Sequence, residues 1–235
     1  MPAEDLPAED LPAADMPAAA GSAPSDPADD GGAPPRALLT HAGLYVTDLE
    51  AMVTFYTALL GLVVTDRGEH LGRELAFLSR DPSEHHQLVF VTGRRAPADV
   101  QLLSQLSFRL DDDDLVSLRW FARRAVELGV RDLEGRNHGN SWSIYFSDPE
   151  RNRLELYTAT PWYVRQPWRV PLDLGETDEA IREGTKRLIE QTGVAWSPVE
   201  AWRASVASQM ALRKQLPADQ EAQPGRAPGA SASAR

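Results

Sequence analysis

The sequence contains no cysteine. This absence excludes disulfides, thiolate nucleophiles and zinc or iron–sulfur sites held by cysteine, while ligation by histidine and carboxylate stays open. The chain also lacks an apolar run of membrane-spanning length, and its N-terminus lacks the basic start and apolar stretch of a signal peptide. We therefore expect a soluble cytoplasmic protein with no membrane partner.

The first 35 residues have no lysine, arginine or aromatic residue and repeat a degenerate five-residue unit (PAEDL, PAEDL, PAADM). Such a segment cannot bury enough apolar surface to offset the entropy lost on ordering. Residues 216–235 are similarly poor in apolar side chains, so we expect both ends, 1–35 and 216–235, to be disordered. The N-terminal end carries eight of the net −11 charges, so the acidic balance says nothing about a substrate. The arginines are scattered along the chain, which argues against a nucleic-acid partner.

Between these ends the sequence repeats one strand–helix–three-strand pattern. The first copy, at about 38–92, begins with a strand at 38–46 and continues with a helix that ends at Gly61. The spacing of Thr47 and Glu50 predicts a capping box at the start of that helix. Further strands are expected at 62–66, 74–78 and 86–92.

The second copy, at about 102–160, aligns with the first when His41 is placed over Gln105 and Leu88 over Leu154. An internal duplication of this kind predicts two units that pack as a pseudosymmetric pair, with their curved sheets around a central cavity. The elements expected in this copy are a helix at 115–128 and strands at 103–110, 130–133, 141–146 and 153–158.

Residues 161–215 follow the duplicated domain of 36–160. Three prolines exclude a central strand or helix at the start of this segment and predict an extended strap at 159–174 (ATPWYVRQPWRVPLDL). Two helices are expected after the strap, one at 177–191 and one that begins at a second capping box formed by Ser197 and Glu200. The last helix has one apolar stripe, which indicates packing or a dimer contact, and we expect a homo-oligomer; the stripe consists of Trp202, Val206 and Met210.

Residues 138–157 (HGNSWSIYFSDPERNRLELY) predict two short strands joined by a tight turn. Alternate apolar side chains mark one face of this hairpin, and Glu155 falls on the other. On an ordinary hairpin such a glutamate is a solvated surface group. A functional role is the second interpretation, because His138 and Tyr145 precede Glu155 and a further histidine, His41, opens the first strand of the chain.

Together these features resemble the vicinal oxygen chelate superfamily, which includes glyoxalase I, the fosfomycin and bleomycin resistance proteins and the type I extradiol dioxygenases. The resemblance covers about residues 38–160. Within the superfamily the chain is most similar to the extradiol dioxygenases, because Tyr145 precedes Glu155 by ten residues across an Asp-Pro turn and FLSRDPSEHHQLVF resembles their His-His segment. The resemblance implies an α+β fold in which two βαβββ units form a curved mixed sheet around a central metal cavity, with C-terminal helices added.

The resemblance also implies a set of metal ligands. The iron of the extradiol enzymes is held by two histidines and one glutamate, which leaves positions open for substrate and dioxygen. By position these ligands correspond to His41, Gln105 and Glu155. Gln105 departs from the pattern, because a carboxamide is a poorer iron ligand than imidazole, although glutamine ligates metal in some glyoxalases. Val89 occupies the position of the second glutamate of glyoxalase I.

The resemblance further implies catalytic roles for three residues. Strand alternation does not decide whether His85 or His86 faces inward, and the resemblance selects His86 as the group that contacts substrate and oxygen. Tyr145 and His138 are expected to contact the ionised oxygens of the substrate. A surface pair of histidines and an ordinary strand tyrosine are the structural alternatives.

Three functions follow, in order of preference. The first is an extradiol-type dioxygenase that uses Fe(II), or Mn(II) or another divalent metal, with a small aromatic substrate and dioxygen. The second is a non-redox enzyme of the superfamily, either a glyoxalase-like isomerase or a resistance-type transferase. The third is a metal-free protein that binds a small molecule, which the glutamine at position 105 would favour.

Overall fold

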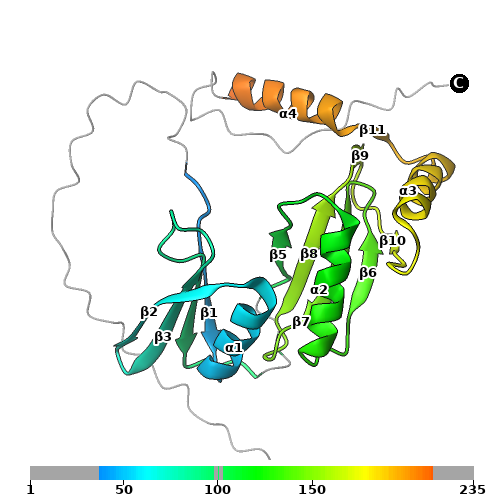
Figure 1. Cartoon of the computed structure of the whole chain (residues 1–235). Helices are drawn as coiled ribbons and strands as arrows, with labels where there is room; N and C mark the ends of the chain where they lie inside the picture. The colour runs from blue at the N-terminus through cyan, green and yellow to red at the C-terminus, as the bar shows by residue number, and fades with distance from the viewer. Residues whose placement is uncertain (1–36, 98–99, 101–102, 214–235) are drawn as a thin grey trace, which may run out of the picture. The chain divides into compact units, whose positions relative to one another are not determined.

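Each copy of the duplicated pattern forms its own sheet in the structure, a computed structural model that describes residues 37–97, 100 and 103–213 (Figure 1). The ends expected to be disordered, 1–35 and 216–235, lie outside the described residues. The first sheet has the strand order β1-β4-β3-β2, with β1 parallel to β4 and the other neighbours antiparallel. The elements of the first unit are β1 (Ala42–Val46), α1 (Leu49–Leu60), β2 (Val63–His70), β3 (Arg73–Ser79) and β4 (Leu88–Thr92).

The second sheet repeats this order as β5-β8-β7-β6 and adds a short C-terminal strand, β10, beside β6. The strand expected at 130–133 begins four residues later, because Val130 still closes the preceding helix by donating its backbone N–H to the carbonyl of Ala125. The elements of the second unit are β5 (Leu106–Arg109), α2 (Leu115–Glu127), β6 (Glu134–Asn137), β7 (Ser141–Ser147) and β8 (Arg153–Ala159).

Strand register confirms the predicted internal duplication. Ala42 pairs with Leu88 in the first sheet, and Leu106 pairs with Leu154 in the second. His41 and Gln105, each one residue before these pairs, are therefore equivalent positions in the two units. By the same registers Val89 is the equivalent of Glu155.

The second sheet has an apolar face and a polar face. Helix α2 lies across β7 and β8 and covers the apolar face (Figure 1). Alternation places Tyr145 and Glu155 on the opposite face, where they stand directly across from each other. The apolar side chains beneath α2 are all at most 1% exposed; they are Trp142, Ile144, Phe146, Leu154 and Leu156.

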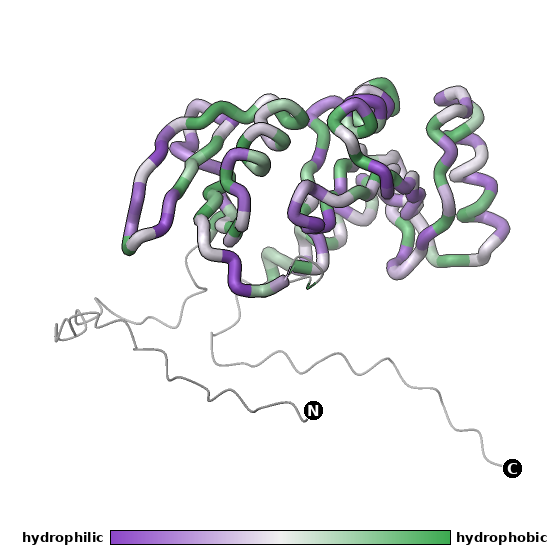
Figure 2. The backbone as a smooth tube through the Cα atoms, turned by 90° about the horizontal axis from the view of Figure 1, so that it is seen from below, coloured by the Kyte–Doolittle hydropathy of each residue, from purple (hydrophilic) through white to green (hydrophobic). Residues whose placement is uncertain are grey.

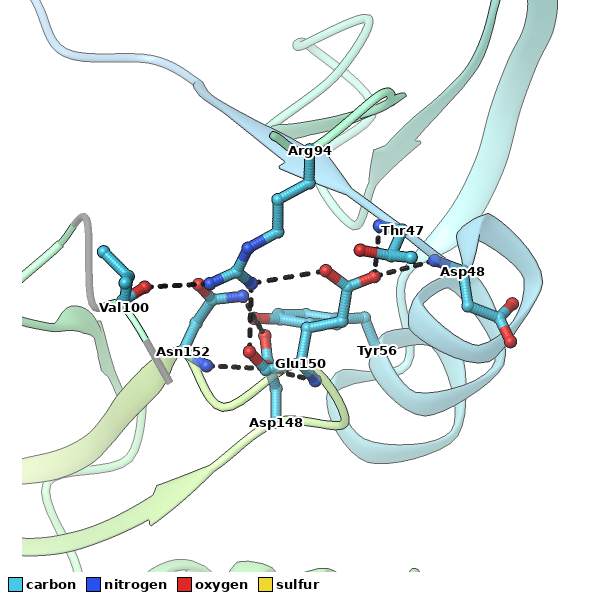
Figure 3. A network of polar contacts seen from close by, with 8 residues as sticks. All are labelled: Thr47, Asp48, Tyr56, Arg94, Val100, Asp148, Glu150 and Asn152. Carbon is cyan, nitrogen blue, oxygen red and sulfur yellow. Dashed lines mark hydrogen bonds and ion pairs between the residues drawn. The ribbon is translucent and has the colours of Figure 1, made fainter. Parts of the chain in front are cut away.

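A buried polar network joins the two units (Figure 3). Glu150, in the turn between β7 and β8, accepts hydrogen bonds from two successive backbone N–H groups, the first of which belongs to Thr47. Arg94, just after β4, pairs with the same carboxylate at 3.3 Å, and the two side chains are only 3% and 8% exposed. The hydroxyl of Tyr56 on α1 donates to Asp148 at 3.0 Å. Both units therefore contribute to one desolvated network.

This network also explains why the capping box expected at the first helix is wrong. With the backbone N–H of Thr47 bound to the second unit, Asp48 becomes the N-cap and accepts a hydrogen bond from the backbone N–H of Ala51. Glu50 does not reach back to the helix start and forms a surface ion pair with Arg67. The expected C-terminus is confirmed, because the residue after α1 is a left-handed glycine.

The C-terminal segment packs on the second unit. Thr185 of α3 accepts hydrogen bonds from the side chains of Asn137 and Trp142, and the amphipathic pattern of α3 is visible in Figure 2. The second capping box is wrong, because Ser197 lies in a strand and the last helix begins at Val199. The elements are β9 (Trp162–Val164), β10 (Val170–Pro171), α3 (Asp178–Thr192), β11 (Trp196–Pro198) and α4 (Val199–Arg213).

The apolar stripe expected on the last helix packs against the rest of the protein only in part. Trp202 stacks on Tyr163 with ring centroids 5.0 Å apart, whereas Met210 is 62% exposed. Among the described residues, no helix combines the length and the apolar character needed to cross a membrane.

Candidate functional site

A pocket of about 470 Å³ opens on the polar face of the second sheet. It contains three of the residues expected at the site, Gln105, His138 and Tyr145, and Glu155 is bonded to two of these. The strap contributes one wall through Arg169. The complete lining consists of Ser104, Gln105, Glu134, Arg136, His138, Tyr145, Arg153 and Arg169.

Glu155 is buried, with 7% of its surface exposed, so the interpretation of a solvated surface glutamate is wrong. Its Oε1 accepts a hydrogen bond of 2.5 Å from the hydroxyl of Tyr145. Its Oε2 accepts from the amide of Gln105 at 2.8 Å and from the hydroxyl of Ser107 at 2.6 Å. All three donors are neutral, and the described residues offer this carboxylate no ion-pair partner. A buried carboxylate without a counter-charge is costly, which makes it a candidate ligand for a cation.

His138 extends the hydrogen-bond chain behind Tyr145. Its Nε2 lies 3.0 Å from the hydroxyl of Tyr145, and its Nδ1 lies 3.1 Å from the backbone carbonyl of Trp168. A carbonyl only accepts hydrogen bonds, so Nδ1 carries a hydrogen and this bond turns Nε2 of the ring toward the tyrosine hydroxyl. Burial, and then the hydrogen bond with Glu155, raise the pKa of Tyr145 above its usual value. Tyr145 therefore keeps its proton and donates it to Glu155, while the oxygen of the same hydroxyl lies beside Nε2 of His138.

The histidines of the first unit form a second cluster. His41 is exposed one residue before β1, and its ring centroid lies 4.4 Å from that of His86. The ring of His86 also contacts Phe77, with centroids 5.1 Å apart, and it is partly buried while the adjacent His85 is exposed. Burial, followed by repulsion from His41, lowers the pKa of His86 below its usual value. His41 and His86 thus lie together on the first unit.

The expected site residues therefore fall into two groups, one on each unit. Glu155, Gln105, Tyr145 and His138 lie together on the second sheet, whereas His41 makes its contacts with the first unit and does not line the pocket. Within the part of the chain that the structure describes, no group of three histidine, cysteine, aspartate or glutamate residues is arranged to hold a metal ion.

Comparison with known proteins assigns the family. The model of the Glyoxalase/Bleomycin resistance protein/Dioxygenase superfamily matches residues 38–156, which is half of the chain and both duplicated units. The chain belongs to this superfamily. The α+β fold of two βαβββ units is accordingly confirmed. No curated protein sequence matches the chain.

Solved structures of the superfamily resemble the chain at low sequence identity. A glyoxylase/bleomycin resistance protein/dioxygenase domain from Frankia sp. EAN1pec is 20% identical, with a TM-score of 0.47, and the match covers 54% of this chain and all of that one. The fosfomycin resistance protein FosX from Mesorhizobium loti is 22% identical, with a TM-score of 0.41, over 51% of this chain and 90% of that one. A variant of FosX from Listeria monocytogenes, in complex with Mn(II) and 1S,2S-dihydroxypropylphosphonic acid, is 17% identical, with a TM-score of 0.42, over 52% of this chain and 91% of that one.

Sequence reasoning missed part of this candidate site. Ser107 stands opposite Glu155 in register, and alternation from Glu155 would have placed Arg153 on the same face. Arg136 was missed because the strand that carries it was expected four residues too early. Arg169 lies in the strap, where no periodicity indicates which side chain faces the pocket.

Proposed function

We propose that this protein is a metal-dependent enzyme of the extradiol dioxygenase type, acting on a small aromatic substrate with two adjacent oxygens. The observation that carries the proposal is the hydrogen bond between Tyr145 and the buried carboxylate of Glu155, with His138 behind the tyrosine. This arrangement combines a ligand for a cation with a hydroxyl and an imidazole beside it. Those are the two functions that binding and deprotonating a catechol require.

The donor groups fit a divalent metal in chemical type. Imidazole from His41 and carboxylate from Glu155 are ligands that iron and manganese accept, and the amide of Gln105 already contacts the carboxylate. Within one chain the histidine and the carboxylate lie in separate groups. We propose that a second copy of the chain completes the site, with the first unit of one protomer facing the second unit of the other. A two-fold axis would then create two equivalent sites.

A divalent metal held by His41, Gln105 and Glu155 would supply a Lewis acid for the two vicinal oxygens and, as iron, the redox chemistry that dioxygen requires. The residues of the chain would orient the substrate and accept its protons. Tyr145 would orient one substrate oxygen by hydrogen bonding, and His138, held through Nδ1 by the carbonyl of Trp168, would place its Nε2 beside that oxygen. His86, whose lowered pKa keeps it neutral near pH 7, is suited to accept a proton from the substrate.

Non-redox chemistry of the same superfamily is the second candidate. It is favoured by Gln105, which stands in place of a histidine and turns its amide group toward Glu155. A carboxamide is a weaker ligand for iron than imidazole, whereas a Lewis-acid role tolerates an oxygen-rich ligand set. In this case the enzyme would be an isomerase or a transferase that consumes no oxygen.

An oxygen electrode separates the two candidates. The full chain is loaded with Fe(II) under anaerobic conditions and then assayed with a panel of catechols. We expect oxygen uptake, a loss of tenfold or more for Tyr145→Phe, and no loss for Tyr163→Phe, since Tyr163 stacks on Trp202 and does not line the pocket. Absence of oxygen uptake by protein that demonstrably contains iron would remove the dioxygenase proposal for that panel and leave the non-redox candidate.

A further inference from the structure

The candidate pocket contains three arginines that converge on a single carboxylate oxygen. The Oε2 of Glu134 lies 3.0 Å from a guanidinium nitrogen of Arg136, 3.6 Å from one of Arg153 and 3.2 Å from one of Arg169. These arginines come from β6, from β8 and from the segment that leads into β10. Together with Glu155, the pocket therefore has three positive and two negative side chains, and a divalent metal at Glu155 would raise the positive excess further.

Glu134 does not satisfy the hydrogen-bonding capacity of these arginines. Each guanidinium carries five N–H donors and binds a carboxylate best through two parallel hydrogen bonds, whereas here three guanidiniums share one oxygen. The Nε of Arg136 is buried and has no partner among the described residues. The hydroxyl of Ser143, directly opposite Arg136 in register, is also buried without a partner in that part of the chain. A buried donor without a partner calls for an explanation, and a ligand in this pocket would supply the missing acceptor.

The arginines stand at a fixed position relative to the proposed reaction centre. The guanidinium carbons of Arg153 and Arg169 lie 4.7 Å and 5.5 Å from the ring centroid of Tyr145. The hydroxyl of the same ring is bonded to Glu155. A ligand that contacts these arginines in the pocket would therefore lie beside the tyrosine ring whose hydroxyl is bonded to Glu155.

We propose that the substrate of this pocket carries an oxyanion group, a carboxylate or a phosphonate, which Arg136, Arg153 and Arg169 bind, while Glu134 occupies the place of this group in the free protein. The side chain of Glu134 is 45% exposed and can turn toward solvent when the ligand enters. This inference rests on the proposed function for the place of the reacting oxygens. The anion subsite itself lies within the second unit and needs neither metal nor a second chain.

A purely structural role for the arginines makes a different prediction. Arg169 belongs to the strap, and its ion pair with Glu134 would then only hold the strap on the sheet. Loss of either partner would weaken the binding of every ligand alike, through a less ordered pocket. An anion subsite instead predicts that the two substitutions act in opposite directions, and only on charged ligands.

Calorimetric titration of the metal-free full chain tests this directly. The ligands are 3,4-dihydroxybenzoate and its methyl ester, which differ in one negative charge. We expect the acid to bind at least about tenfold more tightly than the ester, as charge-assisted hydrogen bonds to a guanidinium predict. Arg169→Gln should remove most of that preference, and Glu134→Gln should strengthen binding of the acid severalfold without affecting the ester. Arg187→Gln, on the exposed side of α3, is the matched control and should change neither.

Benzoate and phenylphosphonate then identify the oxyanion, because the tighter-binding one shows whether the subsite prefers a carboxylate or a phosphonate. Equal affinity for acid and ester would overturn the inference. A preference for the acid that remains in Arg169→Gln would also overturn it, and so would the failure of every anion to bind. Oxygen uptake does not enter this measurement. If the protein prefers the acid but consumes no oxygen, the result supports the anion subsite and contradicts the dioxygenase proposal.

Discussion

Tyr145 and Glu155 face each other across β7 and β8, and the tyrosine hydroxyl donates a 2.5 Å hydrogen bond to the buried carboxylate. The pairing follows from strand register, because the two residues are direct neighbours in the antiparallel ladder. It brings a weak acid and a candidate metal ligand into contact on the polar face of a sheet whose other face is packed under a helix.

Replacing Gln105 with histidine should strengthen the proposed metal site. Gln105 already contacts Glu155 at 2.8 Å, so an imidazole at this position stands beside the carboxylate. We expect Gln105→His to bind Fe(II) at least about tenfold more tightly. Substitutions of residues that only surround the metal ligands already change metal affinity by this amount. Anaerobic competition with a coloured chelator measures the affinity. Gln209→His, on the exposed last helix, controls for adventitious binding by an added histidine, and an equal gain in that variant would contradict the assignment of Gln105.

The polar network between the units should be important for stability. Glu150→Ala leaves the buried guanidinium of Arg94 without its counter-charge and removes the acceptor of the Thr47 backbone N–H. We expect a loss of about 3 kcal/mol or more in the free energy of unfolding, measured in urea. The matched control is Glu50→Ala, whose ion pair with Arg67 involves a side chain that is 69% exposed and should cost about 1 kcal/mol or less. Equal effects of the two substitutions would show that the network is not desolvated in solution.

The strap should depend on a close approach at Gly135. A Cβ added there would lie 2.3 Å from the backbone carbonyl oxygen of Leu172, so one segment has to move. We expect Gly135→Ala to destabilise the protein by about 1–3 kcal/mol and to make the strap more susceptible to limited proteolysis. Gly68→Ala, where a Cβ meets nothing within 4 Å, should change stability by no more than about 0.5 kcal/mol. An unchanged proteolysis pattern in Gly135→Ala would contradict the packing of the strap against β6.

Most of the fold was predictable because hydrophobic periodicity is a local property of the chain. The helix after Asp48 and the strands on either side of the turn at Asp148 follow from residues close in sequence. The duplication added long-range information, because equivalent positions in the two units predicted that His41 and Gln105 correspond. What the sequence did not reveal was the partner of Thr47, because Glu150 lies about a hundred residues away and competes with the local capping interaction.

The candidate site was only partly predictable for the same reason. Tyr145 and Glu155 share a hairpin, so alternation and register place them together. Arg169 reaches the pocket from the strap, where no periodic pattern indicates the direction of a side chain. The contact between His41 and His86 links the start of β1 to the loop before β4, and these strands are neighbours only in the folded sheet.

The central claim is that His41 of one protomer and Glu155 of another hold one divalent metal. The direct measurement is the metal content of a mixed oligomer, in which one chain carries His41→Ala and the other carries Glu155→Gln, purified anaerobically through two different tags. Each variant alone should lose bound metal while keeping its fold. The mixed dimer has one complete site out of two and should hold about half the metal of the original protein. Full metal in Glu155→Gln alone would contradict the role of Glu155, and a mixed dimer without metal would contradict a site shared between chains.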